Sequence, residues 1–371
     1  MDKIINVNRA SMPPIEDYVD LIKPLWDTHF ITNNGVLHSQ LEDEINAYLE
    51  AKNTLLFCNG HAALSCAVRV LDLTGEVITT PFTFASTTHA IVENGLTPVF
   101  CDIKPDDFTI DPYKIESLIT EKTSAILGVH VYGNICYTDA IYTIAKKHDL
   151  KIVYDAAHTF GVNRNGKTAA CFGDISMYSF HATKVFNTIE GGCLTFNDGQ
   201  LVEPLKRIMN FGILAGYIDT IQFGVNAKMS EFSAAMGLCN LRYIEQYINA
   251  RKSVYDKYLS LLSNINGIRV FNITDDYSHN YAYMPVLFDR EILGIDRNDV
   301  FDELKKYNIN TRMYFYPLTS DFACYKDRFV SDTPIAKAIS EDLLCLPMYS
   351  ELALDDVERI CGIIVDLVNR V

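Results

Sequence analysis

Two charged residues near the middle of the chain have types and positions that could perform chemistry together. Lys184 ends the run SFHATK, and Asp155 closes an apolar strand pattern earlier in the chain. A lysine amine can form a Schiff base with an aldehyde cofactor. An aspartate can then hold a proton on the cofactor's ring nitrogen, which draws electrons from the substrate carbon. Enzymes that use pyridoxal phosphate (PLP) need this pair, so we predict amino-group transfer with Lys184 and Asp155 as catalytic residues.

Each of the two residues also has a plainer explanation. Asp155 could cap the following helix, because aspartate is a good N-cap. Lys184 could be a surface lysine whose stem is buried and whose amine reaches water. The catalytic interpretation has a physical advantage for Asp155, since a carboxylate that closes an apolar strand is costly to bury without a positive partner. A protonated ring nitrogen would be such a partner.

A second group of residues could hold the cofactor. In the segment Asn59-Gly60-His61 a strand pattern ends, a glycine turns the chain and a helix begins, and a helix N-terminus favours a phosphate. Phe82 could lie flat on a pyridine ring, and Ser179 could bond the phosphate. His158 could orient Asp155 or face the cofactor. An ordinary turn, a core phenylalanine and a structural histidine are the alternatives.

The order of apolar patterns predicts an α/β fold. Strand patterns alternate with helical spacing through the first 200 residues, which is typical of a mostly parallel sheet covered on both faces. The expected strands are 54–58, 76–79, 97–102, 125–131, 151–155, 175–180 and 192–196. Ligands bind at the carboxyl ends of the strands in such sheets, and Asp155 and the 59–60 turn both fall there.

The pattern changes after residue 230, where a long helix is expected over residues 230–261. Short strands follow at 268–271 and 281–288, with helices at 297–306 and 355–369. We therefore predict a large domain over residues 1–245, with the N-terminal segment included, and a small α+β domain over residues 246–371.

Composition narrows the function classes. The net charge is −15 and the sequence pI is about 5.0, which argues against nucleic acid as a partner. No apolar run reaches the roughly 18–20 residues of a membrane span, and the first residues lack a signal-peptide pattern. The ten cysteines form no C-x-x-C pair, so we expect no metal site and a reducing compartment, the cytoplasm.

Taken in order, these motifs resemble the DegT/StrS family of PLP-dependent nucleotide-sugar aminotransferases, which belong to the fold-type I (aspartate aminotransferase-like) enzymes. The shared strings are NGxAAL, FTF, DAAH, SFHxTK, EGG and GxN before MSE, and the resemblance runs from residue 32 to residue 349. It implies a large domain with a mostly parallel seven-stranded sheet and a smaller α+β C-terminal domain.

The resemblance also implies a role for each residue. Lys184 would carry the cofactor and move protons, and Asp155 would pair with the ring nitrogen. The remaining cofactor contacts would be Phe82 on the ring, His158 beside it, Gly60, His61 and Ser179 around the phosphate, and Asn226 reaching the cofactor of a neighbouring subunit. The last contact would require a homodimer with shared active sites. Relatives often carry threonine at the position of His61, so either its ring or its backbone N–H would contact the phosphate.

The implied partners are L-glutamate as the amino donor and a nucleotide-linked keto-sugar as the acceptor. The expected acceptor is dTDP-4-keto-6-deoxy-D-glucose, aminated at C4 for surface polysaccharide such as O-antigen lipopolysaccharide. The candidate substrate contacts are Thr32, Asn33, Asn34, Arg312 and Tyr316; a surface role for Arg312 is the alternative. A GDP- or UDP-linked sugar, a 3-keto isomer or a non-catalytic regulatory relative also stays open. Lys184 disfavours the dehydratase branch, which carries histidine there.

Overall fold

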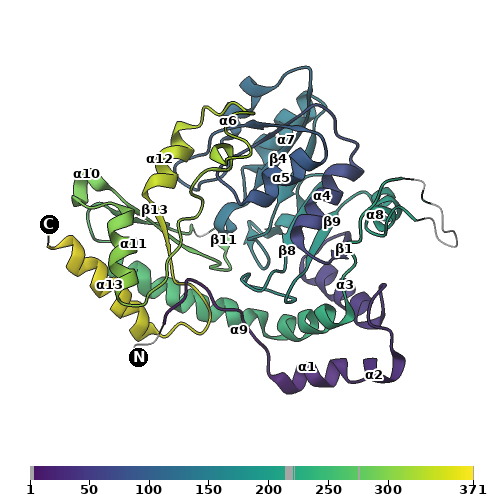
Figure 1. Ribbon diagram of the computed structural model, residues 1–371, viewed down its shortest axis with the longest axis horizontal. Coiled ribbons are helices and arrows are strands. Elements are labelled where there is room, and N and C mark those ends of the chain that lie inside the picture. The colour runs from purple at the N-terminus through teal and green to yellow at the C-terminus, as the bar shows by residue number, and fades with distance from the viewer. Residues whose placement is uncertain (1–3, 214–219, 221, 275, 371) are drawn as a thin grey trace.

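A seven-stranded sheet forms the centre of the larger part of the molecule (Figure 1). The computed structural model describes residues 4–213, 220, 222–274 and 276–370. The strands of this sheet are β1 (Asn53–Phe57), β2 (Glu76–Thr79), β3 (Thr97–Phe100), β4 (Thr123–Val129), β5 (Lys151–Asp155), β8 (Ile175–Ser179) and β9 (Gly192–Phe196). Their spatial order is β1-β9-β8-β5-β4-β2-β3, and only β9 runs antiparallel to its neighbours. The predicted, mostly parallel seven-stranded sheet is confirmed.

Both faces of the sheet are buried, because its strands are apolar almost throughout. In β5 the side chain of Val153 joins one apolar cluster, whereas Ile152 and Tyr154 join another. Alternate residues of a strand point to opposite faces, so both faces need a cover of helices. That cover comes from α4 (Gly60–Val70), α5 (Ala85–Glu93), α6 (Pro112–Ile115), α7 (Thr138–Lys147) and α8 (Val202–Ile208), and over β1, β8 and β9 also from α3 (Val36–Tyr48) and the start of α9 (Glu231–Leu262).

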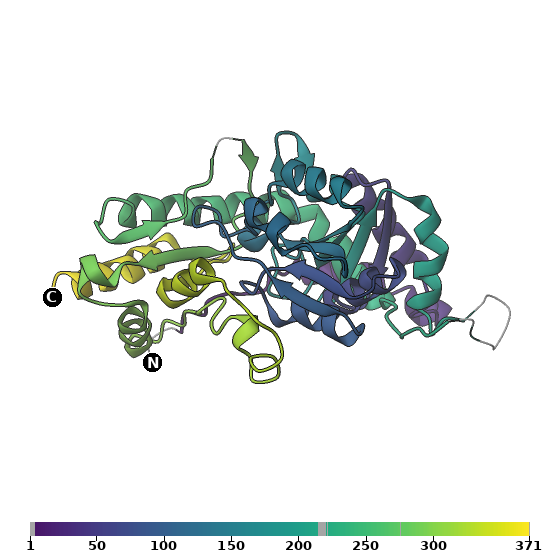
Figure 2. The ribbon, with the colours of Figure 1, turned by 90° about the horizontal axis from the view of Figure 1, so that it is seen from above.

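One long helix connects this layer to the rest of the chain. Helix α9 (Glu231–Leu262) packs against α3 near its beginning and against α13 near its end, and Figures 1 and 2 show it running along both parts of the molecule. Ser230 begins it as predicted, since its Oγ accepts the N–H of Ser233 at 3.1 Å.

The smaller part contains a three-stranded antiparallel sheet and its helices. The strands are β10 (Ile268–Val270), β12 (Met284–Phe288) and β13 (Leu343–Leu346), and the helices are α10 (Arg290–Leu293), α11 (Arg297–Lys306), α12 (Pro334–Asp342) and α13 (Leu354–Val368). The sequence predicted β10, β12, α11 and α13 within three residues. It missed β13, and also the two-residue strands β6 (Asn163–Arg164), β7 (Lys167–Thr168) and β11 (Tyr277–Ser278), which are too short for periodicity.

The N-terminal segment does not lie wholly with the large domain. Helices α1 (Ile15–Ile22), α2 (Leu25–Thr28) and α3 (Val36–Tyr48) do contact the large part. Ile5, however, exchanges backbone hydrogen bonds with Asn308 and Asn310 and is buried in the apolar core of the small domain. The sequence of such a short extended segment does not indicate which domain it packs against, so the prediction placed it with the domain that follows it in the chain.

The predicted boundary at residue 245 lies inside α9, and other links cross between the two parts. Asp102, at the end of β3, accepts the N–H groups of Ile335 and Ala336 at 3.1 and 2.8 Å. It therefore caps the first turn of α12 from the other domain. None of the helices in the described part of the chain combines the length and apolar character needed to span a bilayer.

A buried carboxylate fixes the start of α3 against the start of α9. The Oε2 and Oε1 atoms of Glu231 accept the N–H groups of Leu37 and His38 at 2.8 and 3.1 Å. A Cβ on Gly35 would lie 2.6 Å from Cδ of Glu231, so only glycine fits there. The Met-Ser-Glu string is thus explained by capping, and Glu231 holds the chain on both sides of the 32–34 loop, since its own N–H donates to the carbonyl of Ile31 at 3.0 Å.

We predict that Glu231→Gln destabilises the fold by about 1–3 kcal/mol, because one of the two N–H groups loses its acceptor in a buried site. Urea denaturation measures the change. Glu121→Gln is the matched control, since Glu121 is exposed. Equal stability of the two variants would contradict the capping role.

Candidate active site

Asp155 is the last residue of β5, and its carboxylate is buried with only 5% of the residue exposed. Oδ2 accepts a hydrogen bond from Thr87 Oγ1 at 2.7 Å, and Oδ1 accepts the N–H of Ala157 at 3.1 Å. Burial raises the pKa of this carboxyl above its usual value, while those hydrogen bonds and the charge of Lys184 oppose the rise. A fixed, partly desolvated carboxylate of this kind is suited to a positively charged ring nitrogen.

The Lys184 amine is near Asp155, since the charge of each acts on the pKa of the other, and it lies in a cleft lined by residues from both domains. Its Nζ is 3.2 Å from the Oη of Tyr283, and that Oη is 3.2 Å from Nε2 of His158. The cleft is lined by Ala157, His158, Thr183, Lys184, Asn280 and Tyr283, among others. Burial lowers the pKa of Lys184 and the nearby Asp155 opposes this, so the amine is closer to its neutral, nucleophilic form than a surface lysine.

The predicted phosphate site is assembled where α4 begins. Asn59 caps the helix by accepting the N–H of Ala62 at 2.8 Å. A Cβ on Gly60 would lie 2.9 Å from Cβ of Ser179, and a Cβ on Gly192 would lie 2.7 Å from the backbone of Gly60. The structure therefore brings Gly60 and Ser179 together, and glycine is required for the close approach of α4 to β8 and β9.

The side chain of His61 turns toward α5. Its Nδ1 lies 2.9 Å from Oγ of Ser86, and its Nε2 lies 3.3 Å from Oε2 of Glu93. Both ring nitrogens are therefore engaged. This arrangement favours the backbone N–H of His61 over its ring as the group that would contact a phosphate.

Phe82 lies elsewhere than its predicted role requires. It is 0% exposed and packs edge-on against Tyr132 and Phe315 at centroid distances of 6.1 and 5.6 Å, with Phe108 at 6.2 Å. A ring enclosed in this way has no open face for a cofactor. Phe84, two residues later at the N-cap of α5, is 57% exposed. Two aromatic residues in one short segment cannot be told apart by type alone, and the burial data point to Phe84.

The predicted substrate residues fall into separate places. Arg312 lies 4.8 Å from the ring centre of Tyr314, and its charge acts on Tyr283 in the Lys184 cleft. Tyr316 instead packs against Arg297 of the small domain at 4.4 Å. The segment at residues 32–34 forms an exposed loop in which Asn33 and Asn34 have positive φ.

Asn226 is exposed and lies between α8 and α9 in the chain. Its Oδ1 accepts a hydrogen bond from Lys228 Nζ at 2.7 Å, and its backbone pairs with Asn210. Within the described residues, the hydrogen-bonded partners of Asn226 are Lys228 and, through the backbone bridge, Asn210, and neither lines the Lys184 cleft. Its predicted role toward a neighbouring subunit stays a prediction.

These residues fit PLP. The amine of Lys184, the buried carboxylate of Asp155 and the glycine-lined start of α4 supply groups for the aldehyde, the ring nitrogen and the phosphate, respectively. Within the described residues, no three His, Cys, Asp or Glu side chains are grouped to hold a metal ion.

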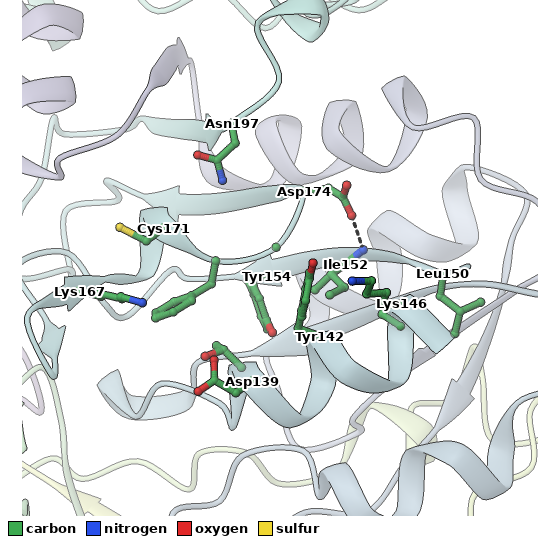
Figure 3. A pocket seen from close by; sticks show the side chains of 14 residues that line it. Asp139, Tyr142, Lys146, Leu150, Ile152, Tyr154, Lys167, Cys171, Asp174 and Asn197 are labelled. Atoms are coloured by element: carbon green, nitrogen blue, oxygen red, sulfur yellow. Dashed lines mark hydrogen bonds between the residues drawn. The ribbon is translucent and has the colours of Figure 1, made fainter. Parts of the chain in front are cut away.

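A larger cavity lies near the amino ends of β5 and β8, away from the carboxyl end of β5 that carries Asp155, and Figure 3 shows the side chains that line it. It measures about 480 Å³ and is lined by Leu150 and Ile152 at the start of β5, and by residues of α7 such as Tyr142 and Lys146. It contains neither Lys184 nor Asp155. Size alone therefore does not locate the chemistry, and the smaller cleft is the candidate active site.

Comparison with known proteins identifies the family of the chain. Residues 15–365 match the DegT/DnrJ/EryC1/StrS aminotransferase family. The chain is 41% identical to a dTDP-4-amino-4,6-dideoxy-D-glucose transaminase of Shigella dysenteriae over 98% of its length and 99% of that protein. It is 40% identical to the Escherichia coli protein of that name, over 97% of each chain. A crystal structure of DesI in the presence of its TDP-sugar product superposes with a TM-score of 0.95 and 31% identity, covering 100% of this chain and 94% of DesI.

The fold and the lysine–aspartate site define a PLP-dependent aminotransferase of fold type I. The chain belongs to the DegT/DnrJ/EryC1/StrS aminotransferase family.

Three site residues were not singled out from the sequence. Thr87 holds Asp155, Phe84 exposes its ring, and Tyr283 contacts Lys184. The string Thr83-Phe84-Ala85-Ser86-Thr87 begins a helix after a strand end, which could have indicated Thr87. Tyr283 is far from Lys184 in sequence, and no local pattern joins them.

We predict that Phe84→Leu weakens PLP binding by about tenfold while stability is kept, because a ring that stacks on the cofactor is lost. Phe82→Leu is expected to cost on the order of 1–2 kcal/mol of stability with near-normal PLP affinity. PLP titration and urea denaturation measure both. The reverse pattern would restore Phe82 as the stacking residue.

Proposed function

We propose that this aminotransferase moves an amino group from L-glutamate to the 4-keto carbon of dTDP-4-keto-6-deoxy-D-glucose, giving dTDP-4-amino-4,6-dideoxy-D-glucose. The observation that supports it most directly is that the Lys184 amine lies near the buried Asp155 carboxylate, close enough for their charges to interact. The choice of sugar is supported by the names of the two relatives at 41% and 40% identity.

Lys184 and Asp155 have different roles in the reaction. PLP, when bound, supplies the electron sink for the reaction. Lys184 Nζ takes a proton from the α-carbon of the amino donor and returns one at C4 of the sugar, and burial keeps enough of this amine neutral to act as a base. Asp155, fixed by Thr87 and Ala157, stabilises positive charge at the ring nitrogen. Donor and acceptor use one site in turn, so the kinetics are ping-pong.

Substrate contacts are assigned from position and charge. Arg312 is one of two arginines, with Arg251, whose charge acts on Tyr283, and a guanidinium matches the diphosphate of a nucleotide-sugar or a carboxylate by its forked geometry. Thr32, Asn33 and Asn34 offer exposed polar side chains for sugar hydroxyls or the base. Tyr316, which is half-exposed beside Arg297, would contact the base at the edge of the small domain.

A homodimer with shared sites is part of the proposal. Large apolar side chains are exposed in α2, in the loop after it and at the start of α3: Trp26 at 64%, Phe30 at 50%, Ile31 at 48% and Val36 at 80%. Grouped exposure of this kind is typical of a protein interface. A second copy on this face would bring Asn226 to the partner's cofactor phosphate.

The cytoplasm and a role in surface polysaccharide synthesis complete the proposal. All ten cysteines are free, as in a reducing compartment. The relatives' product is an activated amino sugar by name, and such sugars are building blocks of lipopolysaccharide O-antigen.

The test is a product assay with purified protein, PLP, L-glutamate and a panel of keto-sugars read by mass spectrometry. We predict amination of dTDP-4-keto-6-deoxy-D-glucose in preference to GDP-linked, UDP-linked and 3-keto sugars. Lys184→Ala should lower turnover by about a thousandfold or more, because the base is gone, whereas Lys252→Ala on the surface of α9 should not.

A faster reaction with a GDP- or UDP-linked sugar would overturn the choice of substrate but keep the chemistry. Normal turnover by the Lys184→Ala protein would overturn the site itself.

A further inference from the structure

Tyr283 lies between the two domains at the reactive amine. It directly precedes β12 of the small domain and is half-buried. Its Oη lies 3.2 Å from Lys184 Nζ and 3.2 Å from His158 Nε2. A phenol oxygen can accept more than one hydrogen bond, so the two neighbours can both be satisfied by it.

The position of the proton on His158 follows from its other contact. The N–H of Tyr132 donates to Nδ1 of His158 at 3.0 Å, so Nδ1 is an acceptor and the ring proton is on Nε2. Burial and the charge of Lys184 lower the pKa of His158 well below its usual value, which keeps the ring neutral. His158 therefore donates one hydrogen bond to Tyr283 Oη, and the phenol is held from the large-domain side.

Tyr132 is itself firmly placed. Its backbone has φ of 56°, its ring stacks on Phe315 at 5.8 Å, and its hydroxyl donates to the carbonyl of Tyr314 at 2.5 Å. A non-glycine residue in this backbone conformation persists only where its surroundings fix it. The chain of contacts from Tyr132 through His158 to Tyr283 thus ends at Lys184 in a defined geometry.

We propose that Tyr283 is a positioning residue. Its hydroxyl holds the ε-amine of Lys184 by a hydrogen bond whenever that amine is free, and this bond fixes the orientation in which the amine takes up and releases a proton. The inference rests on the proposed function, in which Lys184 is the proton carrier. It adds that a residue of the small domain, Tyr283, sets the orientation of the Lys184 amine.

The charged and titratable groups around this pair come from several elements. Those that act on Lys184 or Tyr283 are Asp155 of β5, Arg251 of α9, Arg312 and Tyr314 of the segment before Phe315, and Cys345 of β13. An accepted hydrogen bond at Oη favours the ammonium form of Lys184. Its removal is therefore expected to lower the pKa of Lys184 further, in the same direction as burial.

The experiment compares Tyr283→Phe with Tyr281→Phe. Tyr281 is a neighbouring tyrosine that packs 5.2 Å from Tyr255. In the cofactor-free full-length protein, the pKa of Lys184 is read from the pH dependence of its acylation by acetic anhydride, with peptide mass spectrometry. In the holoenzyme, kcat and KM for L-glutamate are measured by the release of 2-oxoglutarate in the presence of the keto-sugar.

We expect Tyr283→Phe to lower the pKa of Lys184 by about one unit and kcat by about tenfold, with KM changed less than about threefold. In that variant a larger fraction of the Lys184 amine is neutral, but proton transfer is slower because the amine is no longer held in one orientation. Tyr281→Phe should change neither quantity.

A drop in kcat with an unchanged pKa would overturn the proposal, since the loss would then come from packing. A shifted pKa with normal kcat would overturn it as well, because the hydrogen bond would not guide the reaction. The acylation measurement needs no turnover, so failure of this inference can be told from failure of the proposed function.

Discussion

The structure depends on burying a carboxylate and an amine close to each other. Burial alone would push both groups toward their neutral forms: it raises the pKa of Asp155 and lowers that of Lys184. Each charge partly opposes the shift of the other. The hydrogen bonds from Thr87 and Ala157 oppose the rise in the pKa of Asp155 and fix its carboxyl group, which is suited to a cofactor that carries a positive ring nitrogen.

This requirement explains why the parallel sheet and the small domain are joined so closely. Asp155 sits at the carboxyl end of β5, where a parallel sheet places its ligands. Lys184 follows β8, the neighbouring strand, and its partner Tyr283 comes from the small domain. Helix α9, the capping of α12 by Asp102 and the contact between Ile5 and the 308–310 segment hold the two parts together. A shift between the domains would move Tyr283 away from the amine.

Much of this could be predicted from the sequence, because the signals are local. Buried strands such as β5 are continuous apolar runs, and the glycine turn at Gly60 and the cap at Ser230 mark helix starts. The pair of Asp155 and Lys184 followed from chemistry and order in the chain. The remaining features arise from tertiary contacts. Phe82 and Phe84 are the same residue type and differ in burial, which the sequence does not show. Tyr283 contacts Lys184 only because the small domain packs against the large one.

The most direct test of the central claim is the absorbance spectrum of the PLP-loaded protein before and after L-glutamate is added. If Lys184 carries PLP and glutamate is the donor, a band near 410–420 nm should move toward about 330 nm as the cofactor takes up the amino group. The Lys184→Ala protein should lack the first band. A wild-type protein with no such band after added PLP would contradict the assignment of Lys184 and Asp155.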